Sequence, residues 1–435
     1  MVPNKLGFFM PFPSADPTRA REFAADVAFR LQSAGFTAFW AGGCVRDDLL
    51  GRTPADYDVA TSARPDEVRG VFGYRRTLAV GAAFGVITVL GPRGAGQVEV
   101  ATFRTDEAYT DGRHPAGVVF STPEFDAQRR DFTINGLFLD PATGAVHDFV
   151  GGRADLAAGI VRAIGVPAMR FGEDHLRMLR AVRFAAAFGF ALDPATRVAI
   201  ESMRHLVTSV SAERIAAELR AMLTRPGCRR ALEILDETGL AREVLPEVAI
   251  PAGLGSTSNP AIARWREAAT IIEALDEPEL GTTLAALFED AGPGLLRQAA
   301  GRLRLANRDV KLASWLLEAV AAIGHAAAGE LAGRPWSDVQ PWLAHEDAFP
   351  LADLLRARAG QGRGSVGAAA WVTAQLERPR EEIDPSPLVT GRDLLAVGVP
   401  EGKALGEMLA TLRAKQLDGE IVSREAALEW ASKPG

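Results

Sequence analysis

The sequence predicts a small mixed α/β domain in its N-terminal part and an all-helical region after it, so that the chain is mostly α-helical overall. Three observations support this fold class. Short runs with the apolar alternation of β-strands occur up to about residue 152. From residue 153 onward, apolar residues recur at the three-and-four spacing of amphipathic helices. Glycine and proline breaks, such as GLGSTSNP and GQGRGSVG, divide this helical region into several pieces.

The composition is that of a globular protein with more than one domain. A chain of 435 residues exceeds the usual size of a single core, and 48% hydrophobic with 24% charged residues exclude a disordered chain. The two cysteines, Cys44 and Cys228, exclude a disulfide framework and suit a reducing cytoplasm. The N-terminal segment makes a poor signal peptide, and the sequence has no uninterrupted apolar run of about 18 residues, so we expect no membrane contact.

Charge is distributed unevenly around a net value of −7. Residues 31–160 carry 12 Lys or Arg and 16 Asp or Glu, residues 161–230 carry 12 and 6, and residues 231–435 carry 20 and 30. The negative total argues against indiscriminate coating of nucleic acid. An acidic first part beside a basic middle part fits a metal site next to a localised phosphate-binding surface, and a solvated arginine-rich helix gives the same counts.

The α/β domain is expected to begin with a helix and then to alternate strands with short helices. Residues 20–34 have helical apolar spacing and stop at Gly35, and a second helix is expected over 67–72. The predicted strands are FTAFWA (36–41), DYDVAT (56–61), FGVITVL (84–90) and QVEVATF (97–103). A closing hairpin is expected from GLFLDP and AVHDFV, which flank a turn at 142–144.

These patterns divide the chain into five predicted parts. They are a lead-in with the start of the first helix (1–29), the α/β domain (30–152), and three helical parts (153–230, 231–385 and 386–435). Residues 360–390 are the expected linker before the last part.

The first motif, GGCVRDDLLGRTPADYDVA, covers residues 42–60. Asp56 and Asp58 are two apart on a predicted strand, so their side chains leave the same face and repel each other unless a cation lies between them. Hard divalent cations such as Mg²⁺ take oxygen ligands of this kind. The backbone at Gly42 and Gly43 can approach a phosphate closely. Arg46 is expected either to pair with that phosphate or to form an ion pair with its acidic neighbours.

Two further stretches add charged groups to this site. Glu99 lies between valines on a predicted strand, and it either joins the aspartates as a third carboxylate or pairs with Arg104. In QRRDFTINGLFLD, Asp131 and Asn135 are four apart and could share a helical face, where Asn135 would bond a sugar hydroxyl. Arg129 and Arg130 precede them and suit phosphate, or else belong to a charged cluster that caps a helix.

The most specific stretch is GEDHLRMLRAVRF, where Asp174, Arg177, Arg180 and Arg183 recur every three residues along a predicted helix. One interpretation is an Asp–Arg ion pair with two surface arginines. The other is a protein template for a base, in which Asp174 accepts from an exocyclic amine and Arg177 donates to the adjacent ring nitrogen. Cytosine and adenine both present that edge, whereas uracil and guanine do not. An unpaired buried polar group costs about 1–3 kcal/mol, which is enough for selection.

Together, these motifs resemble those of the class II tRNA nucleotidyltransferases, which are the CCA-adding enzymes, and of their bacterial poly(A) polymerase relatives. The similarity lies in GGCVRD with DYD, RRDFTIN and EDHLRMLRAVRF, and it covers about residues 30–230 strongly and the C-terminal 45 residues weakly. The resemblance implies an α/β nucleotidyltransferase head (30–152), a neck that binds the base and RNA (153–230), a helical body (231–385) and a helical tail that contacts tRNA (386–435).

The resemblance also implies roles for individual residues. Asp56 and Asp58 would bind Mg²⁺ and serve catalysis, with Glu99 as a candidate third catalytic carboxylate. The nucleotide-binding residues that it implies are Gly43, Arg46, Arg130, Asp131, Asn135, Asp174, Arg177, Arg180 and Arg183.

The implied activity is template-independent addition of C, C and then A from CTP and ATP to tRNA, by attack of the RNA 3′-hydroxyl on the α-phosphate. Because the motifs contain almost no Lys or His, we expect catalysis by metal and positioning. The alternatives are an A-only enzyme, a poly(A) polymerase and, in a different class, an inactive RNA-binding module. An HD-type phosphohydrolase is disfavoured because His147–Asp148 has no helical His cluster around it. The sequence indicates no particular oligomeric state.

A loop is expected within TDEAYTDGRHPAGVVF (105–120), because its centre has neither strand nor helix periodicity. In the resembling family a loop at this position is tied to the switch from C to A addition, and this chain carries YTDGRHP there. The resemblance implies that Asp111 and Arg113 act by pairing with neck residues. Replacing residues 109–115 with a short Gly/Ser linker would then stop the products at CC.

Overall fold

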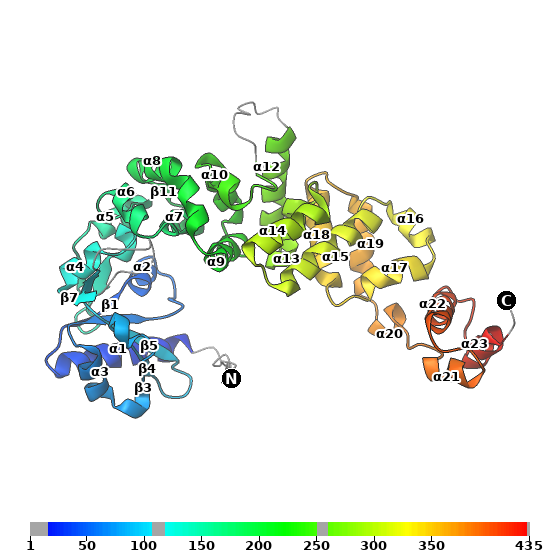
Figure 1. Ribbon diagram of the computed structural model, residues 1–435, viewed down its shortest axis with the longest axis horizontal. Coiled ribbons are helices and arrows are strands. Elements are labelled where there is room, and N and C mark those ends of the chain that lie inside the picture. The colour runs from blue at the N-terminus through cyan, green and yellow to red at the C-terminus, as the bar shows by residue number, and fades with distance from the viewer. Residues whose placement is uncertain (1–15, 107–117, 250–259, 433–435) are drawn as a thin grey trace, which may run out of the picture. The chain divides into compact units, whose positions relative to one another are not determined.

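The structure is a computed structural model that describes residues 16–106, 118–249 and 260–432 (Figure 1). The chain forms two compact units. The first contains residues 1–218 and 234–244, and the second contains residues 219–233 and 245–435. A mixed α/β domain precedes a long series of helices, so the predicted fold class is confirmed. The boundaries of the five predicted parts stay predictions.

A seven-stranded mixed sheet forms the centre of the first unit, with the strand order β3-β4-β5-β2-β1-β8-β9. The β2–β5 pair is parallel, and the other neighbouring pairs are antiparallel. The strands are β1 (Ala38–Ala41), β2 (Asp58–Thr61), β3 (Thr77–Leu78), β4 (Val86–Leu90), β5 (Gln97–Thr102), β8 (Leu137–Leu139) and β9 (Val146–Asp148). A separate antiparallel pair consists of β6 (Arg104–Asp106) and β7 (Val118–Phe120).

The strand positions follow from the sequence pattern. In β5, Val98 and Val100 are buried while Glu99 between them is exposed, which is the period-2 alternation that predicted the strand. The expected hairpin is also present, because β8 pairs with β9 and Gly144 adopts a φ of 73° in the turn between them.

Short helices surround the sheet and continue beyond it. The α-helices that lie wholly in the first unit are α1 (Pro17–Ser33), α2 (Gly43–Leu49), α3 (Pro65–Phe72), α4 (Pro123–Gln128), α5 (Gly152–Ala158), α6 (Pro167–Glu173), α7 (Arg177–Phe188), α8 (Pro194–Met203) and α11 (Leu240–Val244). The 3-10 helices are η1 (Tyr74–Arg76), η2 (Ala82–Phe84), η3 (Thr133–Asn135) and η4 (Arg204–Ser209). The division between the units passes through α9 (Ala212–Leu223) and α10 (Cys228–Glu237).

The first helix begins three residues earlier than its apolar pattern predicts. The Asp16 side chain accepts a hydrogen bond from the backbone N–H of Arg19 (3.0 Å), and Pro17 occupies the first helical position. Both features favour a helix start, because the first N–H groups of a helix lack partners and proline lacks that group. The helix ends at Ser33, just before Gly35.

The region after residue 152 is not entirely helical, as the sequence predicted it to be. Two strands of two residues each, β10 (Ile160–Val161) and β11 (Ala191–Leu192), pair in parallel there. A strand of two residues is too short to show an alternating pattern, so no sequence signal predicts this pair.

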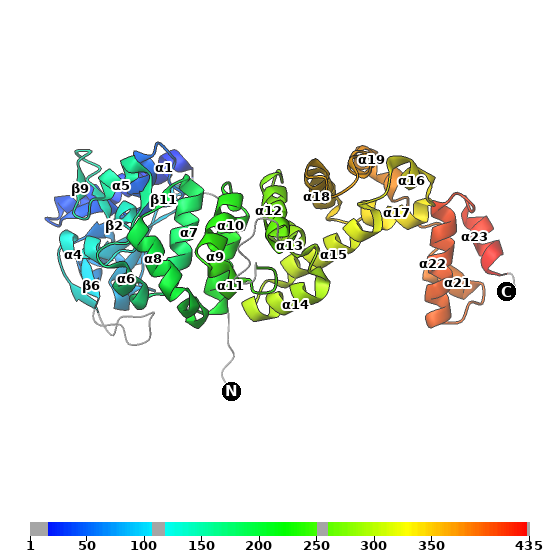
Figure 2. The same ribbon diagram turned by 90° about the horizontal axis from the view of Figure 1, so that it is seen from above.

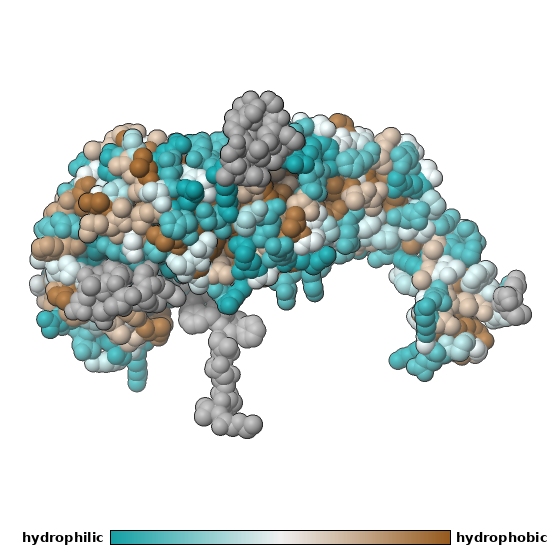
Figure 3. Space-filling model, turned by 45° about the horizontal axis from the view of Figure 1, so that its top comes forward, coloured by the Kyte–Doolittle hydropathy of each residue, from teal (hydrophilic) through white to brown (hydrophobic). Residues whose placement is uncertain are grey.

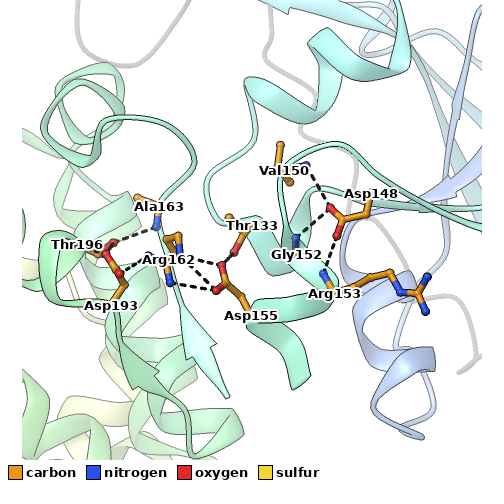
Figure 4. Close-up of polar contacts among 10 residues, drawn as sticks. All are labelled: Thr133, Asp148, Val150, Gly152, Arg153, Asp155, Arg162, Ala163, Asp193 and Thr196. Carbon is orange, nitrogen blue, oxygen red and sulfur yellow. Dashed lines mark hydrogen bonds and ion pairs between the residues drawn. The ribbon is translucent and has the colours of Figure 1, made fainter. Parts of the chain in front are cut away.

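A network of buried carboxylates holds α5 and the start of α8 close to η3 (Figure 4). Arg162 donates to Asp155 at 3.0 Å and also pairs with Asp193. Asp155 in turn accepts from the Thr133 hydroxyl at 2.7 Å. The network fixes the position of η3, which ends at Asn135 in the cleft described below.

Helices make up the second unit (Figures 1 and 2). They are α12 (Pro260–Glu273), α13 (Leu280–Phe288), α14 (Gly292–Leu303), α15 (Asn307–Ile323), α16 (Ala328–Gly333), α17 (Trp336–Leu343), α18 (Ala348–Gly360), α19 (Val366–Leu376), α20 (Arg380–Ile383), α21 (Gly391–Ala396), α22 (Lys403–Leu417) and α23 (Arg424–Ala431). The expected linker at 360–390 instead contains α19 and α20.

Two cores stabilise these helices. Every residue of α13 is buried, and this helix packs against α12, α14, α15 and α18. The last three helices share a smaller core that includes Leu394, Leu412 and Ile421. On the face drawn in Figure 3, hydrophobic residues lie scattered among hydrophilic ones. In the part of the chain that the structure describes, we find no helix long and apolar enough to cross a membrane.

Candidate active site

A cleft of about 670 Å³ opens in the first unit. Its volume lies within the usual range of small-molecule sites, about 300–1,000 Å³. The cleft is lined by all twelve of the residues that the sequence selected for catalysis or nucleotide binding: Gly43, Arg46, Asp56, Asp58, Glu99, Arg130, Asp131, Asn135, Asp174, Arg177, Arg180 and Arg183. Residues from four separate motifs therefore meet at one place.

Three carboxylates meet on the sheet side of this cleft. Asp58 is the first residue of β2, and its Cα is paired with that of Glu99 on the parallel strand β5. Paired positions on neighbouring strands project from the same face of a sheet, so the two side chains are neighbours. Asp56 lies two residues before β2, outside the strand to which it was assigned from the sequence, and still lines the cleft. All three residues keep solvent-exposed surface, although the surrounding cleft partly desolvates the Asp58 carboxylate.

The negative charges of Asp56 and Glu99 disfavour ionisation of Asp58. Desolvation in the cleft, followed by the charges of Asp56 and Glu99, raises the pKa of Asp58 to about 6, while Arg130 opposes this shift. Among the described residues, no group of three or more His, Cys, Asp or Glu is placed so that it could hold a metal ion. The donor set fits a hard divalent cation that takes its remaining ligands from a bound substrate.

The turn between β1 and α2 requires glycine at Gly42. Its φ is 74°, and a Cβ at this position would lie only 2.7 Å from the Arg130 Nη1 atom. A Cβ at Gly43 would make an ordinary contact of 3.6 Å with Arg46. The turn therefore brings the Arg130 guanidinium against the backbone of the glycine pair, at the edge of the cleft.

Asp126 orients the two adjacent arginines. Its Oδ1 accepts from Arg129 Nε at 2.8 Å, and its Oδ2 accepts from Arg130 Nη2 at 3.0 Å. Burial alone would raise the Asp126 pKa, but the two guanidinium groups lower it overall. Arg130 Nη1 also donates to the Asn135 backbone carbonyl (3.3 Å), so its guanidinium has a fixed orientation.

A chain of hydrogen bonds runs across the cleft from α2 to α7. Arg46 donates to Asp47 Oδ1 at 2.7 Å and to Asn135 Oδ1 at 2.6 Å. The Asn135 amide donates to Asp131 Oδ1 at 3.0 Å, and Arg180 Nε donates to Asp131 Oδ2 at 2.8 Å. Arg46 is buried, and its contact with Asp47 is the ion pair with an acidic neighbour that the sequence predicted. Its contact with a phosphate stays a prediction.

Asp131 is the charged centre of this chain. It precedes η3, so it does not share an α-helical face with Asn135 as the sequence suggested. The two residues nevertheless bond directly. Burial would raise the Asp131 pKa, but Arg180, Asn135 and the backbone N–H of Phe132 outweigh it and lower the pKa to about 2.

Asp174 lies between two helices, and the prediction that it shares a helix with Arg177 is wrong. It follows α6 in an extended conformation, while Arg177 is the first residue of α7. Arg214 holds Asp174 through two bonds of 2.7 and 3.2 Å. Arg177 pairs with Glu173 and donates to the Arg170 carbonyl at 2.9 Å. Each residue of the predicted base template therefore has its own charged support.

The Phe184 ring forms the centre of an arginine cluster. The guanidinium carbons of Arg183, Arg46 and Arg180 lie 4.3, 5.1 and 5.4 Å from its centroid. Such distances allow favourable cation–π contacts. Arg183 also donates to Glu218 at 2.6 Å. The ring keeps three like charges beside one another at the cleft.

Sequence motifs did not predict the partners that position these residues, which are Asp126, Glu173, Phe184, Arg214 and Glu218. A weak signal exists for two of them, because Arg214 and Glu218 are four residues apart on the amphipathic stretch SAERIAAELRAML and can share a helix face. The loop at 109–115, with Asp111 and Arg113, lies outside the described residues.

A larger cavity, of about 860 Å³, lies in the second unit. Its charged lining residues are largely engaged with one another. Arg363 contacts Glu267, Glu289 and Asp290, and the buried Arg358 pairs with Glu289. By volume alone, this cavity would be the better candidate for the active site. The smaller cleft is the better candidate by its chemistry, because carboxylates and arginines line its open space.

Comparison with known families agrees with this assignment. Residues 38–162 match the family model described as "Poly A polymerase head domain". Residues 189–250 match the model described as "Probable RNA and SrmB- binding site of polymerase A".

Similarity to individual proteins extends over nearly the whole chain. A CCA-adding enzyme of Levilactobacillus brevis is 32% identical over 94% of this chain and 96% of its own length. A CCA-adding enzyme of Geobacillus stearothermophilus is 42% identical over 50% of this chain and 53% of its own length. The solved structure of the Bacillus stearothermophilus CCA-adding enzyme in complex with CTP matches 95% of this chain and 96% of its own, with a TM-score of 0.76 and 29% identity. A Thermotoga maritima CCA-adding enzyme complexed with tRNA shares the fold, with a TM-score of 0.65 and 20% identity over 96% of each chain. The protein therefore belongs to the family of CCA-adding enzymes.

Proposed function

We propose that this protein adds C, C and then A from CTP and ATP to the 3′ end of tRNA, without a nucleic-acid template. The observation that carries the proposal is a single cleft with Asp56 and Asp58 among its lining residues together with Asp174 and Arg177. The proposal is also supported by relatives that are named CCA-adding enzymes, and by solved structures of such enzymes with CTP, ATP or tRNA.

In this reaction the 3′-hydroxyl of the RNA attacks the α-phosphate of the nucleotide and pyrophosphate leaves. Asp56 and Asp58 would hold Mg²⁺, which offsets the negative charge of the phosphates when bound, and Glu99 stays a candidate third catalytic carboxylate. Among the described residues, no Lys or His lines the cleft. The side chains therefore contribute charge and positioning rather than a covalent nucleophile.

The phosphate and sugar of the nucleotide fit next to the glycine turn. Arg130 is held by Asp126 against Gly42, so a phosphate there meets both a fixed positive charge and an accessible backbone. We assign Asn135 to the ribose. Arg46 is buried and bonded to Asn135, so we assign it to positioning that amide.

The choice of base is assigned to Asp174 and Arg177. A carboxylate beside a guanidinium matches the amine and ring nitrogen that cytosine and adenine share. Uracil and guanine would leave both protein groups unpaired, at about 1–3 kcal/mol each. Arg214 fixes the carboxylate, which favours a preset template over a freely rotating side chain.

We also propose a cytoplasmic location. It is supported by Cys44 and Cys228, which are both buried as free thiols rather than paired in a disulfide.

The test is nucleotide incorporation with labelled CTP or ATP, Mg²⁺ and tRNAs that end before the first C, after C and after CC. We expect C on the first two substrates and A on the third. A addition alone would identify an A-only enzyme, and long A tracts on many RNAs would identify a poly(A) polymerase. No incorporation by the folded protein would indicate the inactive RNA-binding alternative.

The same assay tests the metal ligands. Asp58→Ala should lower incorporation roughly 100-fold or more, because one of two carboxylates that hold the cation is removed. The matched control is Asp66→Ala, an exposed aspartate on α3 outside the cleft, which should retain parental activity. Equal activity of Asp58→Ala and the control would contradict the assignment of this site.

A further inference from the structure

The two aspartates assigned to the cation are not held in place in the same way. Asp58 is the first residue of β2, and its backbone is fixed in the ladder with β5 through the pair with Glu99. Asp56 precedes the strand and has no ladder partner within the described sheet. Mg²⁺ accepts only small departures from octahedral geometry, so the separation of two carboxylates that share it matters. The residue between them, Tyr57, is placed to set that separation.

The side chain of Tyr57 lies on the side of the sheet opposite the cleft. Asp56 and Asp58 line the cleft, whereas Tyr57 does not and is only 4% exposed. Its ring packs on that of Trp40 in β1, with the two centroids 4.9 Å apart. Trp40 is buried and the next residue, Ala41, lines the cleft, so the alternation of the strand directs Trp40 to the opposite side. The helix α1 covers that side, because it packs on β1, β2 and β5.

Arg21 of α1 closes over this aromatic pair. Its guanidinium carbon lies 5.0 Å from the Trp40 ring centroid, a distance that allows a cation–π contact. A guanidinium has only donors, so in its hydrogen bond with Tyr57 it donates to the hydroxyl oxygen. Arg21 also forms an ion pair with Asp48 of α2, the helix that begins at the glycine turn. The segment between the two aspartates is therefore connected to β1, α1 and α2 through one side chain.

The Trp40 indole serves as a packing surface rather than as a hydrogen-bond donor. Its buried Nε1 atom has no hydrogen-bond partner among the residues that the structure describes. Burial of an unpaired donor costs free energy that a phenylalanine at this position would not. The broad indole ring contacts the Tyr57 ring and the Arg21 guanidinium at once. An exception of this kind is expected where a residue serves a site in addition to the core.

We propose that Tyr57 is a positioning residue, which sets the separation of the Asp56 and Asp58 carboxylates. Trp40 and Arg21 hold it from behind the sheet. The proposal rests on the proposed function, because it names what prepares the two carboxylates assigned to Mg²⁺. Since Tyr57 is buried away from the cleft, it acts on a bound nucleotide only through these two aspartates. Its loss should therefore weaken the part of nucleotide binding that depends on the cation and leave the rest unchanged.

The direct test is equilibrium binding of labelled CTP in Mg²⁺ and in EDTA, without RNA, so that no transfer occurs. Tyr57→Ala should weaken binding about tenfold in Mg²⁺ and leave binding in EDTA unchanged, because partners that orient metal ligands contribute about that factor to metal affinity. Unchanged affinity in Mg²⁺ would overturn the proposal. Equal weakening in Mg²⁺ and in EDTA would also overturn it, because such a loss reflects general damage to the fold.

The matched control is Phe72→Ala, which removes another buried ring that contacts an arginine of α1. The Arg30 guanidinium carbon lies 4.5 Å from the Phe72 centroid, and Phe72 does not line the cleft. This variant should lower the melting temperature and keep the parental affinity for CTP in both conditions. A loss of Mg²⁺-dependent binding in Phe72→Ala as large as in Tyr57→Ala would overturn the proposal, because any damage behind the sheet would then suffice.

Two milder variants test the contact between Tyr57 and Arg21. Tyr57→Phe keeps the ring and removes the hydroxyl, so Mg²⁺-dependent binding of CTP should weaken about threefold. Arg21→Met keeps an aliphatic stem over Trp40 and removes the donor. In an Arg21→Met background, Tyr57→Phe should have no further effect, because the same hydrogen bond is already missing. Fully additive losses would overturn the assignment of Arg21 as the group that holds Tyr57.

The parent protein tests the proposed function in the same experiment. A parent that binds CTP no more tightly in Mg²⁺ than in EDTA would contradict the cation site and, with it, this proposal. A parent that responds to Mg²⁺, with Tyr57→Ala responding equally, would overturn this proposal alone. The two failures are therefore distinguishable.

Discussion

At the scale of single residues, Asp131 shows how the cleft holds its charges in place. It is almost fully buried and accepts hydrogen bonds from Arg180, from the Asn135 side chain and from the Phe132 backbone. Because these donors favour the charged form, the pKa of Asp131 falls to about 2 from a normal value of 3.8. The carboxylate therefore stays charged at neutral pH and keeps Asn135 oriented toward the cleft.

The depressed pKa predicts a pH dependence of stability. Above pH 3.8 the carboxylate is charged in both states, so its full contribution is present; below that value the unfolded chain takes up the proton first, and the contribution is lost as the pH falls toward 2. The difference between 3.8 and about 2 corresponds to about 2–3 kcal/mol, because one pKa unit is about 1.4 kcal/mol. We expect Asp131→Asn to lower the free energy of unfolding by about that amount at pH 6 and by less at pH 3.

Denaturant unfolding of the parent and the variant at both pH values measures this. Asp66→Asn is the control for the loss of one surface carboxylate. A destabilisation of the same size at pH 3 and pH 6 would show that the charge of Asp131 is not the cause.

At the scale of elements, the sequence predicts what depends on local pattern and misses what depends on tertiary contact. The strand β5 and the helix α1 are predicted because their apolar periods extend over several residues. The pair β10–β11 is missed because two residues carry no period. The break between α6 and α7 is missed because EDHLRMLR keeps a helical spacing through it.

In the candidate site, too, the sequence predicts the residues that form local motifs and misses those that only tertiary contact brings together. Sequence motifs identified twelve of the residues that line the cleft, because four unusual clusters occur in one order along the chain. Their supports could not be predicted, because Arg214 is 40 residues from Asp174 and only folding brings them together. The predicted phosphate contact of Arg46 shows a second limit. Sequence spacing does not reveal that this guanidinium is buried and bonded to Asn135.

The carboxylate network around Arg162 yields a prediction for the elements it joins. Arg162 lies between Asp155 and Asp193, whose side chains are only 10% and 6% exposed (Figure 4). Arg162→Ala would leave both carboxylates without this cation, so we expect a loss of about 2 kcal/mol in the free energy of unfolding. Arg197→Ala is a matched control, because Arg197 lies between Glu201 and Glu237, which are 41% and 38% exposed.

Exposed ion pairs contribute about 0–1 kcal/mol, so the control should change stability little. Denaturant unfolding of the two variants beside the parent provides the comparison. Equal destabilisation by Arg162→Ala and Arg197→Ala would mean that burial of the carboxylates does not set the strength of this network.

At the scale of the whole molecule, the two units differ in chemistry. The first contains the cleft and all the residues assigned to nucleotide binding. The second contains the larger cavity, whose charged groups mostly pair with one another. The chemistry assigned to nucleotide transfer therefore lies within the first unit.

The central claim is that protein side chains, rather than a nucleic-acid template, select C and A. Its most direct test is kcat/KM for CTP, ATP, UTP and GTP, measured for the parent, for Asp174→Ala and for His175→Ala as control. His175 is adjacent in sequence but does not line the cleft. We predict that Asp174→Ala lowers the preference for CTP and ATP over UTP and GTP about 10-fold to 100-fold, because the carboxylate that accepts the exocyclic amine is gone. The control should keep that preference. An equal loss of activity toward all four nucleotides in Asp174→Ala, with the preference intact, would contradict the claim.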